Sequence, residues 1–119
     1  MTGIHQDRPW GFYQNIDFSR KYKVKRIYVN PNSKFSLQYH RDREEHWIVV
    51  EGSGKLTLGE EVREVTIGEY IHIPTGTIHR LEGGKKGILI IEVQMGECME
   101  DDIVRLDDDY GRIGTTTYC

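Results

Sequence analysis

The sequence predicts an all-β barrel built as a single domain. Short apolar runs rich in β-branched residues recur along the chain, and Gly, Pro or Asn residues punctuate them. No stretch shows a 3.6-residue apolar period over the length that a helix needs. A chain of 119 residues can bury one hydrophobic core but is too short for two. These three observations together indicate a β-barrel or a jelly roll.

The first part of the chain predicts an arm and two strands. Residues 1–20 contain an irregular Pro-Trp-Gly run among aromatic residues, which indicates an arm that packs on the barrel. Residues 21–29 alternate apolar and cationic side chains, as a strand does. Pro31-Asn32 turns the chain into a strand at 35–40, and residues 41–44 form a charged bend.

The remainder of residues 21–96, the predicted barrel, consists of strands separated by turns. The run 45–51 has the strongest strand signal, and glycine-containing turns follow at 52–54, 59–60 and 83–87. Further strands are expected at 55–58, 62–67, 70–73, 77–81 and 88–95.

Residues 97–119 form an acidic C-terminal tail, which we expect to present a solvated face. Ile103, Val104 and Leu106 are available to hold it against the barrel, and residues 115–119 resemble a frayed end.

Composition and charge argue against several classes of protein. The net charge of −3 does not favour a nucleic-acid partner, because phosphate backbones require clustered Lys and Arg. No apolar run approaches the length of a membrane span. Residues 1–8 lack the apolar centre of a signal peptide, and Cys98 and Cys119 have neither metal-type spacing nor a disulfide framework. We therefore expect a cytoplasmic protein.

Four polar residues predict a metal site inside the barrel. Gln38 and His40 share one face of a strand because side chains at i and i+2 point the same way. Glu45 follows a turn on the neighbouring strand, and His79 arrives from a distant one. Imidazole, carboxylate and amide oxygen suit a divalent first-row metal, so Zn, Mn, Fe(II), Ni and Co all remain open.

The spacing of these residues resembles the paired motifs of the cupin superfamily. The two motifs read Gln38-x-His40-x4-Glu45-x6-Gly52 and Gly68-x5-Pro74-x-Gly76-x2-His79. This resemblance implies a double-stranded β-helix, which is a jelly-roll barrel, around a metal.

Longer matches resemble the type II phosphomannose isomerases, cupins that usually form the C-terminal part of bifunctional mannose-1-phosphate guanylyltransferase/mannose-6-phosphate isomerase enzymes. The matching segments are Arg8-Pro-Trp-Gly, Lys23-Val-Lys-Arg, Ser36-Leu-Gln-Tyr-His, Glu45-His-Trp, Ile73-Pro-Thr-Gly, His79-Arg-Leu-Glu, Ile91-Glu-Val-Gln and Glu100-Asp-Asp-Ile-Val-Arg. No Gly-rich nucleotide loop precedes them, so the sequence looks like the isomerase module standing alone.

The resemblance implies an enzyme that interconverts mannose-6-phosphate and fructose-6-phosphate, at the head of GDP-mannose supply for polysaccharides. Its ligands resemble a Gln/His/Glu/His zinc set, which implies one divalent ion per chain, with zinc the first choice. The family usually has His where this sequence has Asp42. That difference favours the alternative, a non-catalytic metal-containing cupin that binds a sugar or sugar phosphate.

An aldose–ketose isomerase needs a general base, and the candidates are Glu92, Asp42, His46 and Glu45 itself. Glu92 and Gln94 share a strand face, so both are expected to line the pocket.

A phosphosugar also needs cations. The candidates, in order, are Lys25, Arg80 and Arg26. Trp10, Tyr13, Tyr39 and Trp47 are possible sugar-stacking surfaces. A homodimer is expected, because an open strand edge would otherwise invite association.

Overall fold

The computed structural model describes residues 4–96, 102–110 and 114–116, and the regular structure in these ranges is all strand. No helix that is long and apolar enough to cross a membrane occurs in these ranges. The prediction of an all-β fold is confirmed. The strands are β1 (Ile4–Arg8), β2 (Gly11–Phe18), β3 (Tyr22–Val29), β4 (Leu37–Tyr39), β5 (Arg43–Leu58), β6 (Glu61–Thr66), β7 (Tyr70–Ile73), β8 (His79–Gly96), β9 (Ile103–Asp107) and β10 (Gly114–Thr116).

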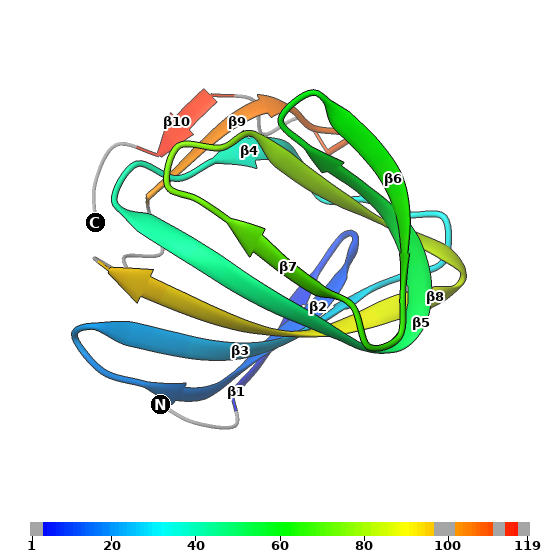
Figure 1. Ribbon diagram of the computed structural model, residues 1–119, viewed down its shortest axis with the longest axis horizontal. Helices are drawn as coiled ribbons and strands as arrows, with labels where there is room; N and C mark the ends of the chain where they lie inside the picture. Colours follow the sequence, from blue (N-terminus) through cyan, green and yellow to red (C-terminus); the bar gives the residue numbers. More distant parts are fainter. Residues whose placement is uncertain (1–3, 97–101, 111–113, 117–119) are drawn as a thin grey trace.

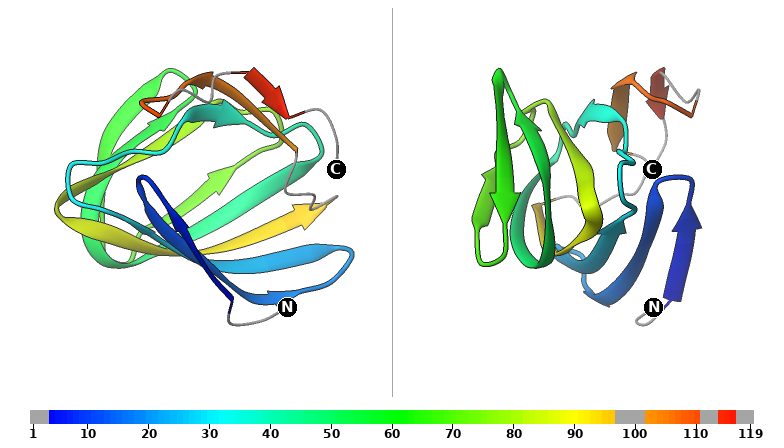
Figure 2. Two further views of the ribbon diagram at one scale, coloured as in Figure 1. Left: turned by 180° about the vertical axis from the view of Figure 1, so that it is seen from behind. Right: turned by 90° about the vertical axis from the view of Figure 1, so that its right-hand side faces the viewer.

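All the strand pairs are antiparallel, and the sheet curls around a central interior (Figure 1). One path through the sheet runs β1-β2-β3-β8-β4-β9-β10, and β5 joins it by pairing with β6, β7 and β8. Figure 2 shows the β1–β2 hairpin on one side of the molecule and β6 with β7 on the other. The curl places residues from distant parts of the chain around one interior.

Two strands are longer than the sequence predicts. β5 and β8 run through the glycine segments at 52–54 and 83–87, where we expected turns, and pair with each other along most of their length. A Cβ on Gly52, whose φ is 75°, would lie 2.1 Å from the Gly87 carbonyl oxygen. The missing side chains let the two backbones approach, and the register shifts there as in a β-bulge. The glycines bend these strands and do not end them.

The two ends of the described chain both join the sheet. In the segment expected to be an arm, β1 and β2 form a hairpin that pairs with β3, and Trp10 between them is buried in the core. In the expected acidic tail, β9 pairs with β4 and with β10. Asp102 and Asp108 are buried, so the expectation of a solvated face is wrong for them. Cys98 and Cys119 lie outside the described residues.

Strict alternation along the first half of β5 separates the inside of the molecule from the outside. Arg43, Glu45, Trp47 and Val49 are buried, whereas the residues between them are partly or fully exposed. Around this inner face lies a core of apolar side chains. Its largest fully buried apolar members are Trp47, Leu56, Ile71, Ile73, Leu81, Ile88, Ile90 and Val29. Charged residues at inward positions therefore belong to an interior site, because an unpaired charge would not be tolerated there.

Candidate functional site

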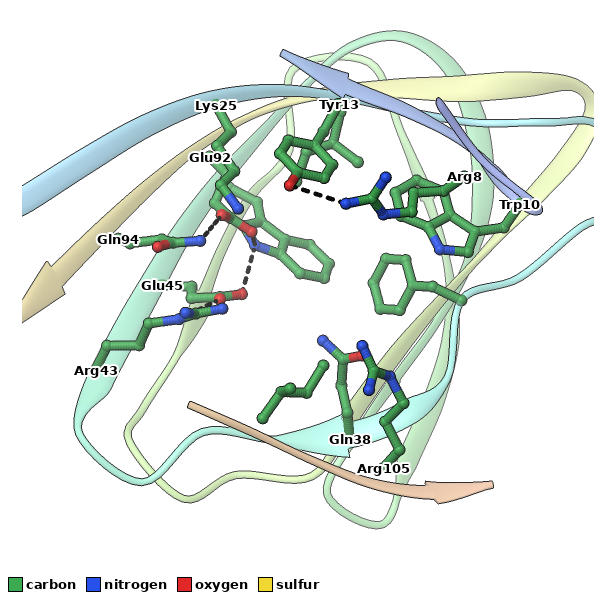
Figure 3. A pocket seen from close by; sticks show the side chains of 14 residues that line it. Arg8, Trp10, Tyr13, Lys25, Gln38, Arg43, Glu45, Glu92, Gln94 and Arg105 are labelled. Carbon is green, nitrogen blue, oxygen red and sulfur yellow. Dashed lines mark hydrogen bonds and ion pairs between the residues drawn. The ribbon is translucent and has the colours of Figure 1, made fainter. Parts of the chain in front are cut away.

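A cavity of about 260 Å³ opens into the curl of the sheet (Figure 3). Its walls come from strands β1, β2, β3, β4, β5, β8 and β9 and from residues next to them. The carboxylates Glu45 and Glu92 lie on one side of it, and the cations Arg8 and Arg105 on the other. The lining is a mixture of charged, amide and aromatic side chains, which is the composition that a polar small molecule requires.

Beneath Glu45 lies a buried cluster of two histidines and the carboxylate, which we call the inner cluster: His40, Glu45 and His79. The Glu45 Oε2 atom lies 3.1 Å from His40 Nε2, and Glu45 Oε1 lies 3.7 Å from His79 Nε2. Ligand atoms of the three residues all fall within 4.8 Å of one another. The cluster can therefore hold a metal ion.

Backbone carbonyls orient both imidazoles of the inner cluster. His40 Nδ1 lies 2.6 Å from the Asp102 carbonyl oxygen, and His79 Nδ1 lies 2.9 Å from that of Thr77. Because a carbonyl can only accept, each Nδ1 carries a proton and each ring turns its Nε2 toward Glu45. Burial lowers the pKa of His79 to about 4, which keeps this ring neutral. Rings held in this way are typical of metal-ligating histidines.

The lone pairs around Glu45 require a cation. Arg43 supplies part of it, because its Nε donates to Glu45 Oε2 at 3.1 Å and its Nη2 lies 3.3 Å from His40 Nε2. His79 Nε2 is fully buried and has no hydrogen-bond partner. Burial by itself would raise the pKa of Glu45, but His40 and Arg43 hold it well below its usual value. A divalent ion fits this donor set, and it would satisfy His79 Nε2 while replacing the Arg43 bond to His40.

Gln38 extends the same set from β4. Its Nε2 lies 3.4 Å from His40 Nε2, and Ser36 Oγ donates to its Oε1 at 2.6 Å. Because the serine hydroxyl can also accept, turning the amide by 180° would aim its oxygen at the histidines. All four residues that the sequence predicts as ligands are thus brought to one place.

Glu92 is the second buried carboxylate. It accepts hydrogen bonds from Trp47 Nε1 at 3.1 Å and from Gln94 Nε2 at 2.6 Å. Burial, reinforced by the charge of Glu45, raises the pKa of Glu92 to about 8. Trp47 Nε1 also lies 3.2 Å from Glu45 Oε1, so one indole connects the two carboxylates. A carboxyl group with a pKa near neutrality, inside a cavity, is a candidate general acid–base.

Cations and aromatic rings complete the cavity wall. Lys25 is buried on β3, with its ammonium 4.3 Å from the centre of the Tyr13 ring. Arg8 donates to the Tyr13 hydroxyl at 3.2 Å. Arg105 on β9 and Trp10 also line the cavity.

Several residues that the sequence predicts for the site lie elsewhere, since they do not line this cavity. Arg26 is exposed on the other face of β3. Arg80 bonds to the Phe35 carbonyl oxygen and to Asp107, in the orientation that alternation from His79 requires. Asp42 is exposed in the bend before β5, and Tyr39 also lies outside the cavity wall.

His46 is likewise on the outer face of β5, where it bonds to Glu44 and Tyr70. The same alternation that turns Glu45 inward turns His46 outward, so the structure does not support His46 as a base in the cavity.

Three cations that line the cavity are not among the site residues that the sequence predicts. Arg43 precedes Glu45 by two residues and shares its face, because β5 begins at Arg43 and the predicted bend at 41–44 is too long by two residues. Arg8 and Arg105 lie at opposite ends of the chain, and only the curled sheet brings them to the same cavity. No local sequence pattern indicates that these two residues share a cavity.

The protein family described as "Mannose-6-phosphate isomerase C-terminal" matches residues 2–108. The xanthan biosynthesis protein XanB of Xanthomonas campestris pv. campestris is 50% identical over 107 residues, which are 88% of this chain and 23% of XanB. The mannose-1-phosphate guanylyltransferase ManC of Salmonella typhimurium is 46% identical over 108 residues, 89% of this chain and 22% of ManC. The chain thus spans about a quarter of the length of these relatives.

Solved structures resemble the fold. KdgF from Halomonas sp. superposes with a TM-score of 0.75 at 17% identity, covering 82% of this chain and 89% of KdgF. An RmlC-like cupin from Shewanella frigidimarina gives 0.74 at 19% identity, covering 83% and 87%. Oxalate decarboxylase from Bacillus subtilis gives 0.77 at 16%, covering 89% of this chain and 31% of that chain. The fold is the cupin barrel, as the sequence motifs predict.

Proposed function

The chain belongs to the mannose-6-phosphate isomerase C-terminal family, and from that premise we propose that its cavity interconverts mannose-6-phosphate and fructose-6-phosphate. The observation that carries the proposal is Glu92, a buried carboxyl whose pKa is raised to about 8 beside the metal-competent inner cluster. An aldose–ketose isomerisation needs a group that both takes and returns a proton near neutral pH.

Glu92 is the proposed base. Its carboxylate accepts the proton from C2 of the aldose and returns it to C1 of the ketose, while the hydroxyl proton passes from O2 to O1. Trp47 and Gln94 hold the two oxygens of Glu92 in fixed positions through their N–H groups. Fixed positions matter because proton transfer requires the carboxylate to lie within hydrogen-bond reach of the carbon-bound proton.

The proposed ligands of one divalent ion per chain, zinc by first choice, are Gln38, His40, Glu45 and His79. Such an ion polarises a carbonyl and stabilises negative charge on the sugar oxygens. Glu45 would connect the two parts of the site, because it belongs to the inner cluster and also lines the cavity. Arg43, which bonds to both Glu45 and His40, is a second source of positive charge at the reacting end.

The phosphate is proposed to lie at the far side of the cavity, against Arg8 and Arg105 (Figure 3). Guanidinium groups match phosphate oxygens with paired N–H donors. Lys25 is closer to the carboxylates, since it pairs across the sheet with Glu92, and is better placed for a sugar hydroxyl. This arrangement replaces the predicted phosphate ligands Arg26 and Arg80, which lie outside the cavity.

The alternative is a non-catalytic cupin that binds a sugar phosphate. It was favoured by Asp42, which stands where the resembled family has His. Asp42 is exposed and does not line the cavity, so this difference leaves the inner cluster and Glu92 untouched. The raised pKa of Glu92 therefore favours the enzyme over the binding module.

The test is a coupled assay of the metal-loaded protein, with mannose-6-phosphate supplied and fructose-6-phosphate measured. We expect turnover that a chelator abolishes and that added divalent metal restores. Glucose-6-phosphate, the C2 epimer, serves as the control substrate and is expected to react more slowly. Stoichiometric metal without turnover on either sugar would reject the isomerase and support the binding module. Oligomeric state and cellular location stay predictions: a homodimer in the cytoplasm.

A further inference from the structure

A second group of histidine and carboxylate side chains lies on the opposite face of the sheet from the cavity. We call it the outer cluster: Glu44 and His46 on β5 and His72 on β7. Glu44 Oε1 lies 2.8 Å from His46 Nε2 and 3.0 Å from His72 Nε2. All three side chains reach solvent, with exposed fractions of 40% for Glu44, 26% for His46 and 44% for His72. None of them lines the cavity.

The strand register brings these side chains together. β5 and β7 are antiparallel, and His46 is the direct cross-strand partner of His72. Their rings stack with centres 4.6 Å apart and planes 14° apart. Glu44 precedes His46 by two residues and shares its face. Backbone pairing thus fixes where the three side chains begin, and hydrogen bonds join both rings to Glu44.

The orientation of the rings also suits a cation. Both Nε2 atoms point at the same carboxylate oxygen, so three potential ligand atoms converge within 4.8 Å. The Tyr70 hydroxyl lies 2.6 Å from His46 Nδ1 and fixes that ring from behind. When an ion binds the Nε2 lone pair, Nδ1 carries the proton, and the Tyr70 hydroxyl oxygen can accept a hydrogen bond from that N–H group. A polar partner on the other ring nitrogen is a common feature of metal-bound histidine.

We propose that Glu44, His46 and His72 form a second divalent-metal site on the outer face of the sheet, selective for Zn²⁺ and similar first-row ions. Two imidazoles and one carboxylate are the donors that such ions prefer. Water completes the coordination, because the site is open to solvent. The ion would link β7 to β5 on the face of the sheet opposite to Glu45. This proposal does not depend on the isomerase activity.

The test is calorimetric titration of the metal-stripped protein with Zn²⁺. We expect two ions per chain, the outer one binding more weakly because its site is exposed and has three protein ligands. His72→Ala should leave the inner ion in place and weaken the outer one by at least about 100-fold, since even losing a partner that merely supports a ligand costs about 10- to 100-fold. His79→Ala should weaken the other ion, which separates the two sites.

The matched control is His5→Ala. His5 bonds to the carboxylate of Asp7 at 2.7 Å on the exposed strand β1, but this pair has a single histidine. The control should bind two ions as the unaltered protein does. Circular dichroism would reveal whether His72→Ala fails to fold. In that case His72→Gln, which keeps more of the side-chain bulk, is used in its place. An unaltered protein that binds one ion, a His72 variant that binds two with unchanged affinities, or an equal loss in His5→Ala would each overturn the proposal.

Cu²⁺ gives an independent readout. Its electron paramagnetic resonance spectrum should show a second signal with nitrogen couplings from two imidazoles, and His72→Ala should remove that signal. A spectrum that His72→Ala leaves unchanged would also reject the outer site.

Discussion

β5 carries a histidine–carboxylate cluster on each of its two faces, one residue apart in sequence. Glu45 belongs to the inner cluster with His40 and His79, whereas Glu44 belongs to the outer cluster with His46 and His72. The residue types are the same. Their environments are not: Glu45 is 2% exposed as a residue, and the Glu44 side chain is 40% exposed.

The difference shows how burial decides what one set of side chains can do. Hydrogen bonds from His46 and His72 lower the pKa of the exposed Glu44, and water can still reach its carboxylate. On the inner face, burial drives the pKa of Glu92 up and that of His79 down, and each charge needs a partner. The inner face can therefore perform acid–base chemistry near neutral pH, whereas the outer face is suited to binding an ion.

The largest effect is expected from Glu45→Gln. The change removes the only carboxylate of the inner cluster as described, so the ion of the inner cluster and the isomerase activity should be lost together, with the affinity for that ion falling by at least about 100-fold. Calorimetric titration with Zn²⁺, which resolves the inner ion from the outer one, and the coupled assay measure both quantities. Glu51→Gln, an exposed change on the same strand, is the control. If Glu45→Gln binds the inner ion with its original affinity, Glu45 is not a ligand.

Glu92→Gln should separate chemistry from metal binding on the inner face. The amide keeps the shape of the side chain but cannot accept a proton, so kcat should fall by about 100- to 10,000-fold while metal content stays constant. A variant with kcat within about tenfold of the original would assign the base elsewhere. Binding of fructose-6-phosphate should persist, which would exclude misfolding as the cause.

Arg8→Ala should act at the far side of the cavity from Glu92. Hydrogen bonds to charged groups contribute about 1.5–3 kcal/mol, so we expect KM for mannose-6-phosphate to rise by about 10- to 100-fold with a smaller change in kcat. Steady-state kinetics measure both constants, with the exposed Arg20→Ala as the control. A fall in kcat alone would place Arg8 in the chemical step and the phosphate elsewhere.

The stability of the metal-free protein should depend on pH through the inner face. Glu92 has a pKa of about 8 when folded against 4.5 otherwise, so between these values the folded state binds more protons, and stability falls as pH rises. His79, with a pKa of about 4 against 6.5, acts in the opposite direction below pH 6.5. Between pH 6.5 and 8, only the effect of Glu92 remains of these two.

In that interval the free energy of unfolding should drop by about 1–2 kcal/mol, given about 1.4 kcal/mol per unit of pKa difference. Urea unfolding at pH 6.5 and pH 8 measures it. In Glu92→Gln the drop should vanish. An equal drop in that variant would show that another group is responsible.

The sequence predicts the features of the fold and of the site that depend on local geometry. Alternation placed Gln38 with His40 and Glu92 with Gln94, and turn residues located most strands. It did not distinguish a glycine turn from a glycine bulge at Gly52, because both require a residue without a side chain. It also could not show that β9 pairs with β4, which brings Arg105 to the cavity, because that pairing joins segments far apart in the chain.

The smallest effect is expected from Asp42→Asn. Asp42 lies in the bend between β4 and β5, where its backbone N–H donates to Asp102 Oδ2 at 2.8 Å and its side chain is exposed. Removing the charge leaves that backbone bond in place, so kcat and KM should stay within about twofold. A fall of tenfold or more in kcat would mean that the exposed bend contacts the substrate during turnover. The residues that contact the substrate would then include the exposed bend, and not only side chains on the inward face of β5.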